Sequence, residues 1–370
     1  MQLPKYVLDI LQTLENADYE SYVVGGSVRD YLIGRTPHDY DIATQALPTS
    51  IIALFPHTAP TGIKYGTVTV LAEAPVEVTT YRKDGPYRDR RRPTDVTFSS
   101  RILDDLARRD FTINAIAYSP TRGFYDPFSG QIDLHNRVIR TVGNPHKRFQ
   151  EDTLRILRGI RFCSSLGKEW SLESETVKAM KSQARQLRFI SKERITEEFI
   201  KLLMGVAPTR GLEELSAIAK DAFENELIVS KRLEEVPLRM ELRLSLVLQD
   251  NPWLFDWLIL SRQKLNHINK VLTNYPLPHT TTELRHLCFH IGREHLDDWL
   301  IARGLTPQAE ALANTPIFPQ ELAISGSDII KVKGKGPIVG ETLNKLAFYV
   351  RENPSLNTKE ELLKLILREP

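Results

Sequence analysis

Cysteine is scarce in this chain, because only Cys163 and Cys288 occur among its 370 residues. Two cysteines exclude a disulfide framework and a cysteine-based zinc site, and they fit a reducing compartment. Long apolar runs are also missing. No stretch approaches the roughly 20 apolar residues of a membrane-spanning helix, and the first residues lack the hydrophobic core of a signal peptide. The sequence therefore predicts a cytoplasmic protein that does not use a membrane.

A strong charge of either sign is absent as well, because 49 Lys and Arg nearly balance 47 Asp and Glu. Any affinity for nucleic acid must therefore come from where the basic residues lie rather than from the net charge of +2. The 41% of hydrophobic residues fits a globular protein. A chain of 370 residues is longer than a single hydrophobic core usually supports. We expect two or more subdomains.

The most informative segment that is present runs from Val24 to Asp30 and reads Val-Gly-Gly-Ser-Val-Arg-Asp. Its glycine pair lets backbone amides approach an anionic ligand, and a helix expected to begin at Ser27 would direct its positive end at the same place. Arg29 is available to meet phosphate. An ordinary helix cap is the alternative interpretation. Together with the acids that follow, the segment predicts a triphosphate site that includes Gly26 and Arg29.

Two acids follow nine residues later in the sequence Asp-Tyr-Asp-Ile-Ala, which we expect to form a strand over residues 39–43. Asp39 and Asp41 would project from one face, since side chains alternate along a strand. Two like charges this close need a cation, and hard oxygen ligands combined with substrate phosphates select Mg²⁺. A solvated acidic turn is the alternative. The glycine pair, followed by the two acids, predicts nucleotidyl transfer.

Three motifs in order carry a family resemblance. The first joins the glycine pair to the two acids, the second reads Arg-Arg-Asp-Phe-Thr-Ile-Asn-Ala over residues 108–115, and the third spans residues 151–162. Together they resemble the class II tRNA nucleotidyltransferase and bacterial poly(A) polymerase family, whose head is polymerase-beta-like. The specific motifs cover about residues 22–200, and the C-terminal part is similar, more loosely, to the CCA-adding branch.

The resemblance implies an α+β protein with a nucleotidyltransferase head followed by an all-helical neck, body and tail. The pattern along the chain agrees, because strand-like segments recur up to about residue 142 and helical periodicity dominates from about residue 145. Apolar positions Val7, Ile10, Leu11 and Leu14 predict an amphipathic first helix. The expected parts are the head at 1–142, the neck at 143–204, the body at 205–315 and the tail at 316–370.

The resemblance also implies roles for single residues. Glu77, an acid between two β-branched residues, would be a third carboxylate that takes the proton from an RNA 3′-hydroxyl. Without the resemblance, an exposed strand residue is the alternative for Glu77. Arg109 would bind the triphosphate, while Asp110 and Asn114 would meet the sugar or order the site. Arg194 would brace the neck by pairing with acids.

Four charged residues of the third motif are spaced by three: Asp152, Arg155, Arg158 and Arg161. On one helix they would form a spiral stripe that a single ligand could touch at several heights. Asp152 accepts and Arg155 donates, so the pair could read the base edge shared by cytosine and adenine, with Arg158 and Arg161 nearer the phosphates. A solvated face of ion pairs is the alternative.

Three other segments have less certain meanings. Residues 82–93 contain a Gly-Pro step and dense charge, which predicts an irregular loop beside the active site, or a basic surface loop. In the family, a loop here helps the switch from C to A addition. His286 and His290 lie four apart but lack a third ligand, so we expect ordinary histidines. Residues 331–337 lack the Walker spacing, and both a tRNA-contacting patch and a solvated turn remain open.

The function that the resemblance implies is template-independent addition of CCA to the 3′ end of tRNA. CTP and ATP would be the substrates, Mg²⁺ the cofactor and pyrophosphate the leaving group, with no obligate protein partner. The nearest alternatives are a bacterial poly(A) polymerase and a partial enzyme that adds only CC or only A. A non-catalytic RNA-binding protein is a further alternative, which the presence of Asp39, Asp41 and Arg29 opposes.

Overall fold

The computed structural model describes residues 1–87 and 94–368. The chain divides into two compact units: Met1–Glu234 with Trp253–Ile259, and Glu235–Pro252 with Leu260–Pro370. The first unit holds the sheet and the second is helical, so the α+β class expected from the sequence is confirmed. The finer division into head, neck, body and tail stays a prediction.

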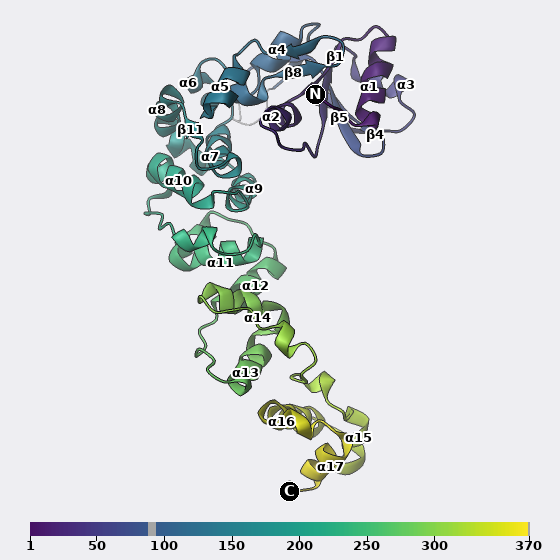
Figure 1. Cartoon of the computed structure of the whole chain (residues 1–370), viewed down its shortest axis with the longest axis vertical. Helices are drawn as coiled ribbons and strands as arrows, with labels where there is room; N and C mark the ends of the chain where they lie inside the picture. The colour runs from purple at the N-terminus through teal and green to yellow at the C-terminus, as the bar shows by residue number, and fades with distance from the viewer. Residues whose placement is uncertain (88–93, 369–370) are drawn as a thin grey trace. The chain divides into compact units, whose positions relative to one another are not determined.

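One mixed sheet dominates the first unit (Figure 1). Its strand order is β3-β4-β5-β2-β1-β8-β9. β2 and β5 run parallel, whereas the other neighbouring strands pair antiparallel. The strands lie at or near the segments expected from alternation. Their bounds are β1 Ser21–Val24, β2 Asp41–Thr44, β3 Thr58–Gly62, β4 Thr67–Leu71, β5 Pro75–Thr80, β8 Ala117–Ser119 and β9 Gly123–Tyr125.

Two short ribbons accompany the sheet: β6 (Arg82–Asp84) pairs with β7 (Val96–Phe98), and β10 (Val138–Ile139) with β11 (Ser171–Leu172). β6 corrects the expectation that residues 82–93 contain no regular structure. The cause is non-local, because β7 supplies the backbone partners that the local sequence does not indicate. Residues 88–93 of that expected loop lie outside the described part of the chain.

The two faces of the sheet differ in chemistry. Strand register places Val23, Ile42 and Val78 on one face, and all three are fully buried. Helices α1 (Lys5–Asn16) and α3 (Pro48–Leu54) contact each other and these strands. α1 buries the four apolar positions expected of it, which confirms the amphipathic first helix.

The opposite face is apolar at one end and acidic at the other. Tyr22 and Ala43 pack with Leu106 of α4 (Ile102–Ala107). One step along the strands, Asp41 lies between Val24 and Glu77 in register. The acidic end of this face therefore opens where β1 ends and β2 begins.

Helices complete the first unit and surround α7, which contacts both α9 and α10. The longer ones are α2 Gly26–Leu32, α5 Gly130–Asn136, α6 Pro145–Glu151, α7 Arg155–Leu166, α8 Ser174–Gln183, α9 Lys192–Leu203 and α10 Pro208–Phe223. Single 3₁₀ turns are η1 Ile63–Tyr65, η2 Thr112–Asn114, η3 Ala184–Phe189 and η4 Lys231–Glu234.

The second unit has two apolar clusters, one around the buried Trp299 and one around Ile329 and Val350. His286 bonds Glu352 at 2.7 Å, as an ordinary polar side chain would. No helix in the described ranges has the length and apolar character needed to cross a bilayer. Its helices are α11 Met240–Asp250, α12 Arg262–Leu272, α13 Thr281–Ile291, α14 Arg293–Ala302, α15 Gly326–Lys333, α16 Ile338–Glu352 and α17 Lys359–Arg368, and its 3₁₀ turns are η6 Glu310–Leu312, η7 Pro319–Glu321 and η8 Pro354–Leu356. The 3₁₀ turn η5, Pro252–Asp256, belongs to the first unit from Trp253 onward.

Candidate active site

A cavity of about 430 Å³ lies between the acidic face of the sheet and the start of α7. Strands β1, β2, β4 and β5 form one wall, α7 contributes to another, and the segment 108–114 lies between them. Ten residues were predicted for the site, and they divide into two groups. Gly26, Asp41, Glu77, Arg109, Arg155 and Arg158 line the cavity, whereas Asp39, Arg29, Asp152 and Arg161 are not among the lining residues.

Two carboxylates stand side by side on the sheet wall. Asp41 and Glu77 are partners in the parallel register of β2 and β5, so their side chains share one face. The pKa of Asp41 is raised, first by burial and then by the charges of Glu77 and Asp39, although Arg109 opposes the rise. A bound cation would stabilise the charged form of these carboxylates, because it offsets both the cost of burying their charge and the repulsion between them.

Asp39 lies just before β2 and is exposed, so the strand expected over residues 39–43 begins only at Asp41. The reason is that β1, its antiparallel partner, ends at Val24, opposite Asp41. Within the described ranges, no group of three or more His, Cys, Asp and Glu side chains is arranged as a complete metal site. Mg²⁺ usually takes one or two carboxylates with water and substrate phosphate, and the oxygens here fit that pattern.

Gly25 allows Arg109 to approach the acids. Its φ of 79° lies in the left-handed region that favours glycine. A Cβ at this position would lie 3.0 Å from Nη1 of Arg109 and 3.7 Å from Oδ2 of Asp41. A side chain here would therefore displace the guanidinium from the cavity. Helix α2 begins at Gly26, one residue before the expected start at Ser27.

Arg29 is held inside the protein. Its Nη2 pairs with Asp30 at 2.8 Å and its Nη1 donates to Asn114 at 2.8 Å. Its guanidinium also lies 5.2 Å from the ring centroid of Phe162 in α7. Arg29 therefore ties α2 to the segment behind the cavity wall.

Asp105 of α4 is a residue that the sequence analysis missed. Its fully buried carboxylate accepts bonds of 2.9 and 2.7 Å from Arg108 and of 3.1 Å from Arg109. Burial alone would raise the pKa of Asp105, but the two guanidinium groups hold that pKa below its ordinary value. The only local signal was the spacing of three and four residues, which is equally common in exposed ion pairs.

The expected four-residue stripe on one helix is wrong. Asp152 lies between α6 and α7 with extended backbone, φ −143° and ψ 103°. Its carboxylate accepts from the backbone N–H of Leu154 at 3.1 Å, a local bond by which aspartate commonly interrupts a helix. The same carboxylate pairs with Arg194 at 2.9 Å, so Arg194 does bind an acid of the neck segment.

The three arginines that remain on α7 each have an acidic partner. Arg155 is buried, and it also donates to the carbonyl oxygen of Arg108 at 3.2 Å. Asp110 is buried too, and although burial would raise its pKa, Arg158 and Arg155 hold that pKa below the ordinary value. The pairs are Arg155 with Glu151 at 2.8 Å, Arg158 with Asp110 at 2.8 Å, and Arg161 with Glu198 at 2.7 Å.

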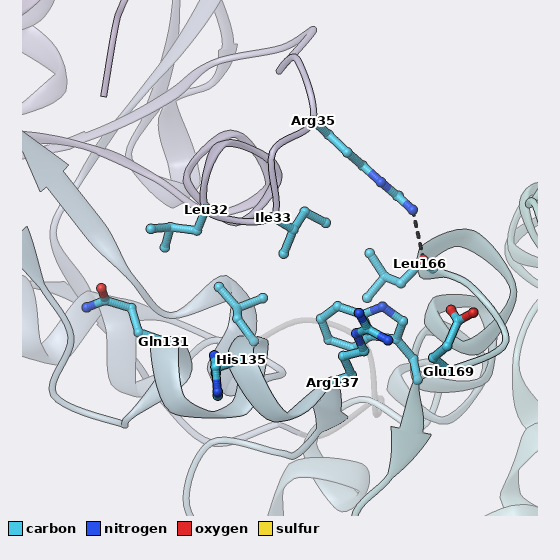
Figure 2. Close-up of a pocket in the computed structure, with 10 residues that line it drawn as sticks. Leu32, Ile33, Arg35, Gln131, His135, Arg137, Leu166 and Glu169 are labelled. Carbon is cyan, nitrogen blue, oxygen red and sulfur yellow. Dashed lines mark hydrogen bonds between the residues drawn. The ribbon is translucent and has the colours of Figure 1, made fainter.

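A second cavity, of about 510 Å³, lies where α2, α5 and α7 end (Figure 2). Figure 2 shows Arg35 reaching from the end of α2 toward Leu166, where it donates to the backbone oxygens of Ser165 and Leu166 at 2.9 and 2.8 Å. Helix C-termini carry partial negative charge, so they account for arginine here. None of the ten predicted residues is among the residues that line this cavity.

Two family models match parts of the first unit. The model described as Poly A polymerase head domain matches residues 21–140, which include Asp41, Glu77 and Arg109. The model described as Probable RNA and SrmB- binding site of polymerase A matches residues 170–217, which extend from β11 into α10.

Whole-chain relatives and structures agree with these models. The CCA-adding enzyme of Listeria monocytogenes serovar 1/2a is 38% identical over 394 residues, with 96% of each chain covered. The crystal structure of Bacillus stearothermophilus CCA-adding enzyme in complex with CTP is 33% identical, with a TM-score of 0.84 and coverage of 99% of this chain and 98% of that chain. The Thermotoga maritima CCA-adding enzyme complexed with tRNA shares the fold at 20% identity and a TM-score of 0.67, with 99% of this chain and 96% of that chain covered.

Proposed function

Because this chain belongs to the CCA-adding enzyme family of tRNA nucleotidyltransferases, we propose that it adds C, C and A in turn to the 3′ end of tRNA. CTP and ATP are the substrates, Mg²⁺ is the cofactor, and pyrophosphate leaves at each step. The observation that carries the proposal is the register of Asp41 with Glu77 on a cavity wall that Arg109 also faces.

The proposed chemistry uses the sheet wall. The tRNA 3′-hydroxyl attacks the α-phosphate, the bond between the α-phosphorus and the bridging oxygen breaks, and Glu77 takes the hydroxyl proton. Arg109, Arg158 and the backbone at Gly26 bind the triphosphate and balance charge on the departing pyrophosphate. Mg²⁺ held by Asp41 and Asp39 would supply charge stabilisation at the reacting phosphate.

In the proposal, residues at the junction between α6 and α7 select the nucleotide base. Arg155 lines the cavity, and Arg194 fixes the carboxylate of Asp152. A carboxylate has about four acceptor positions, so the bonds from Arg194 and Leu154 leave capacity for an exocyclic amino group. Cytosine and adenine both carry such a group, which supports a protein template in place of a nucleic-acid one.

The proposal includes tRNA as the macromolecular partner and the cytoplasm as the location. The two cysteines, Cys163 and Cys288, are free and buried, in keeping with a reducing compartment.

The test uses tRNA transcripts that end before the first C, after C and after CC. Each is incubated with one nucleoside triphosphate at a time, and the products are sequenced. We expect C on the first two transcripts, A on the third, and no further growth. Removal of divalent cations with a chelator should stop all three additions, and excess Mg²⁺ should restore them. Repeated addition of A to unrelated RNA would instead identify a poly(A) polymerase, and arrest after CC would identify a partial enzyme.

A further inference from the structure

We propose that Asp105 is a positioning residue of the nucleotide site, whose carboxylate keeps Arg109 directed at the triphosphate and away from Asp41. This inference rests on the proposed function, in which Arg109 binds the triphosphate. Asp105 itself does not line the cavity, so it acts through the two arginines that do.

The carboxylate of Asp105 serves both arginines at once. One oxygen, Oδ1, accepts two bonds from the fork of Arg108, and the other, Oδ2, accepts one bond from Nη2 of Arg109. The side chain of Asp105 is 0% exposed, whereas those of Arg108 and Arg109 are 19% and 18% exposed. The anchor is therefore inside the protein, and the arginines that it holds reach the cavity.

A purely structural ion pair explains this arrangement poorly. Exposed pairs at this spacing contribute little to stability, and a buried carboxylate costs more than an apolar side chain of similar size. In addition, Nε of Arg109 is buried and has no hydrogen-bond partner among the described residues. Arg109 is therefore anchored to Asp105 through Nη2, while the same side chain lines the cavity in which an anionic ligand would bind.

Asp105 and Asp41 are two acids that can both attract Arg109, and Asp105 holds it. Nη1 of Arg109 and Oδ2 of Asp41 face the same space beside Gly25, because they lie 3.0 Å and 3.7 Å from the position that a Cβ would take there. If Asp105 lost its charge, the guanidinium would be drawn to the remaining carboxylate. It would then occupy Asp41, so both the triphosphate and the cation would lose a partner.

The decisive variant is Asp105→Asn, with Asp104→Asn as its matched control. Asp104 is the adjacent acid, and it contacts Ser99, Arg101 and Lys83 rather than the cavity arginines. In Asp105→Asn we expect the KM for CTP and for ATP to rise together by about tenfold or more, with the KM for tRNA unchanged. The Mg²⁺ concentration needed for half-maximal rate should rise as well. Asp104→Asn should leave all three quantities at the wild-type value.

Equilibrium binding of CTP without tRNA gives a readout that is independent of turnover. Asp105→Asn should weaken it by the same factor as the KM. If Asp105→Asn fails to fold, the comparison moves to Arg108→Gln against the double variant Asp105→Asn with Arg108→Gln. These two differ only in the carboxylate and leave fewer unpaired charges, and the double variant should bind CTP more weakly by about tenfold.

Wild-type KM, CTP affinity and Mg²⁺ requirement in Asp105→Asn would overturn the inference, as would equal losses for tRNA and nucleotides. Failure of the proposed function would look different, because the wild-type protein itself would then add neither C nor A to the tRNA transcripts.

Discussion

The two walls of the cavity bear opposite charges and satisfy them differently. On the helix wall, Arg155 and Arg158 each pair with an acid at 2.8 Å. On the sheet wall, no hydrogen bond or ion pair joins Asp41 or Glu77 to another side chain in the part of the chain that the structure describes, and Arg109 acts on Asp41 only as a nearby charge. The arginines are thus held in place by the protein, whereas the carboxylates are available to a ligand.

This difference separates what each wall contributes. Neighbouring carboxylates that lack hydrogen-bonded or ion-pair partners lower the stability of the folded protein, and a bound cation raises that stability again. Paired arginines cost the fold less, and their geometry is fixed before any ligand binds. We therefore expect substitutions of the sheet-wall acids to remove activity while they relieve charge repulsion. Substitutions on the helix wall should alter the choice of nucleotide base or lower the stability of the fold.

The largest effect is expected from Asp41→Asn. In the proposed mechanism this carboxylate holds the cation that serves every addition, so incorporation of C and A should both fall by about 10³-fold, equivalent to roughly 4 kcal/mol. The measurement is single-turnover incorporation on the three tRNA transcripts. tRNA affinity should stay near wild type, because phosphate contacts elsewhere supply it.

Asp9→Asn is a suitable control, because Asp9 pairs with Lys5 on the exposed side of α1 and lies outside the cavity. Its rates should equal those of the wild type. A version of Asp41→Asn that still adds A at the wild-type rate would show that C and A do not share one site.

Sequence reasoning succeeded where the signal was local. The glycine pair and the acid at Asp41 depend on near neighbours, and the strand around Glu77 follows from local alternation. That Glu77 stands beside Asp41 was expected only from the family resemblance. The family resemblance supplied the order of the motifs and the α+β class, which the matching family models bear out.

The same reasoning failed where the determinant was distant or where a side chain competed with the helix. Spacing by three assumed a continuous helix, but Asp152 bonds its own backbone two residues on and interrupts it. Asp105 has the spacing of a surface ion pair, and only the packing of α4 against the sheet makes it buried. β6 depends on a partner strand beyond the loop, at Val96–Phe98.

An intermediate effect on base selection is expected from Asp152, which lies just before α7, and from Arg155 on the helix wall. Asp152→Asn replaces an acceptor that suits an exocyclic amino group with a side chain that also donates, so UTP or GTP should compete measurably. The expected loss of discrimination is about 1–3 kcal/mol, or roughly 5- to 150-fold. Arg155→Ala should weaken CTP and ATP together. The measurement is single-nucleotide incorporation with all four triphosphates.

Glu193→Gln is the control for these variants, because Glu193 is an exposed acid beside Arg194 in α9. It should keep the wild-type order of preference. If Asp152→Asn and Arg155→Ala slow every triphosphate equally, the helix wall binds phosphate and does not read the base.

The smallest effect is on the stability of the metal-free protein, where replacing an acid that pairs with an arginine of α7 and replacing an acid of the sheet wall should change stability in opposite directions. Glu198→Gln leaves the largely buried Arg161 without its partner and should lower stability by about 1–3 kcal/mol, whereas Glu197→Gln on the exposed side of α9 should not. Asp41→Asn removes a carboxylate that the fold disfavours and should raise the Tm by a few degrees, as single favourable substitutions do.

The pH dependence distinguishes this gain from an unrelated one. Because burial and neighbouring acids raise the pKa of Asp41 in the folded state, the folded protein holds this proton more tightly than the unfolded chain does. The contribution of Asp41 to stability therefore falls as pH rises from its ordinary pKa through its raised folded value. Asp41→Asn should accordingly exceed the wild type in Tm at pH 7 and lose that advantage in acid, where Asp41 is protonated in both states. A gain in Tm that is the same at every pH would mean that the carboxylate charge is not the cause, and the contrast between the two walls would then lose its electrostatic basis.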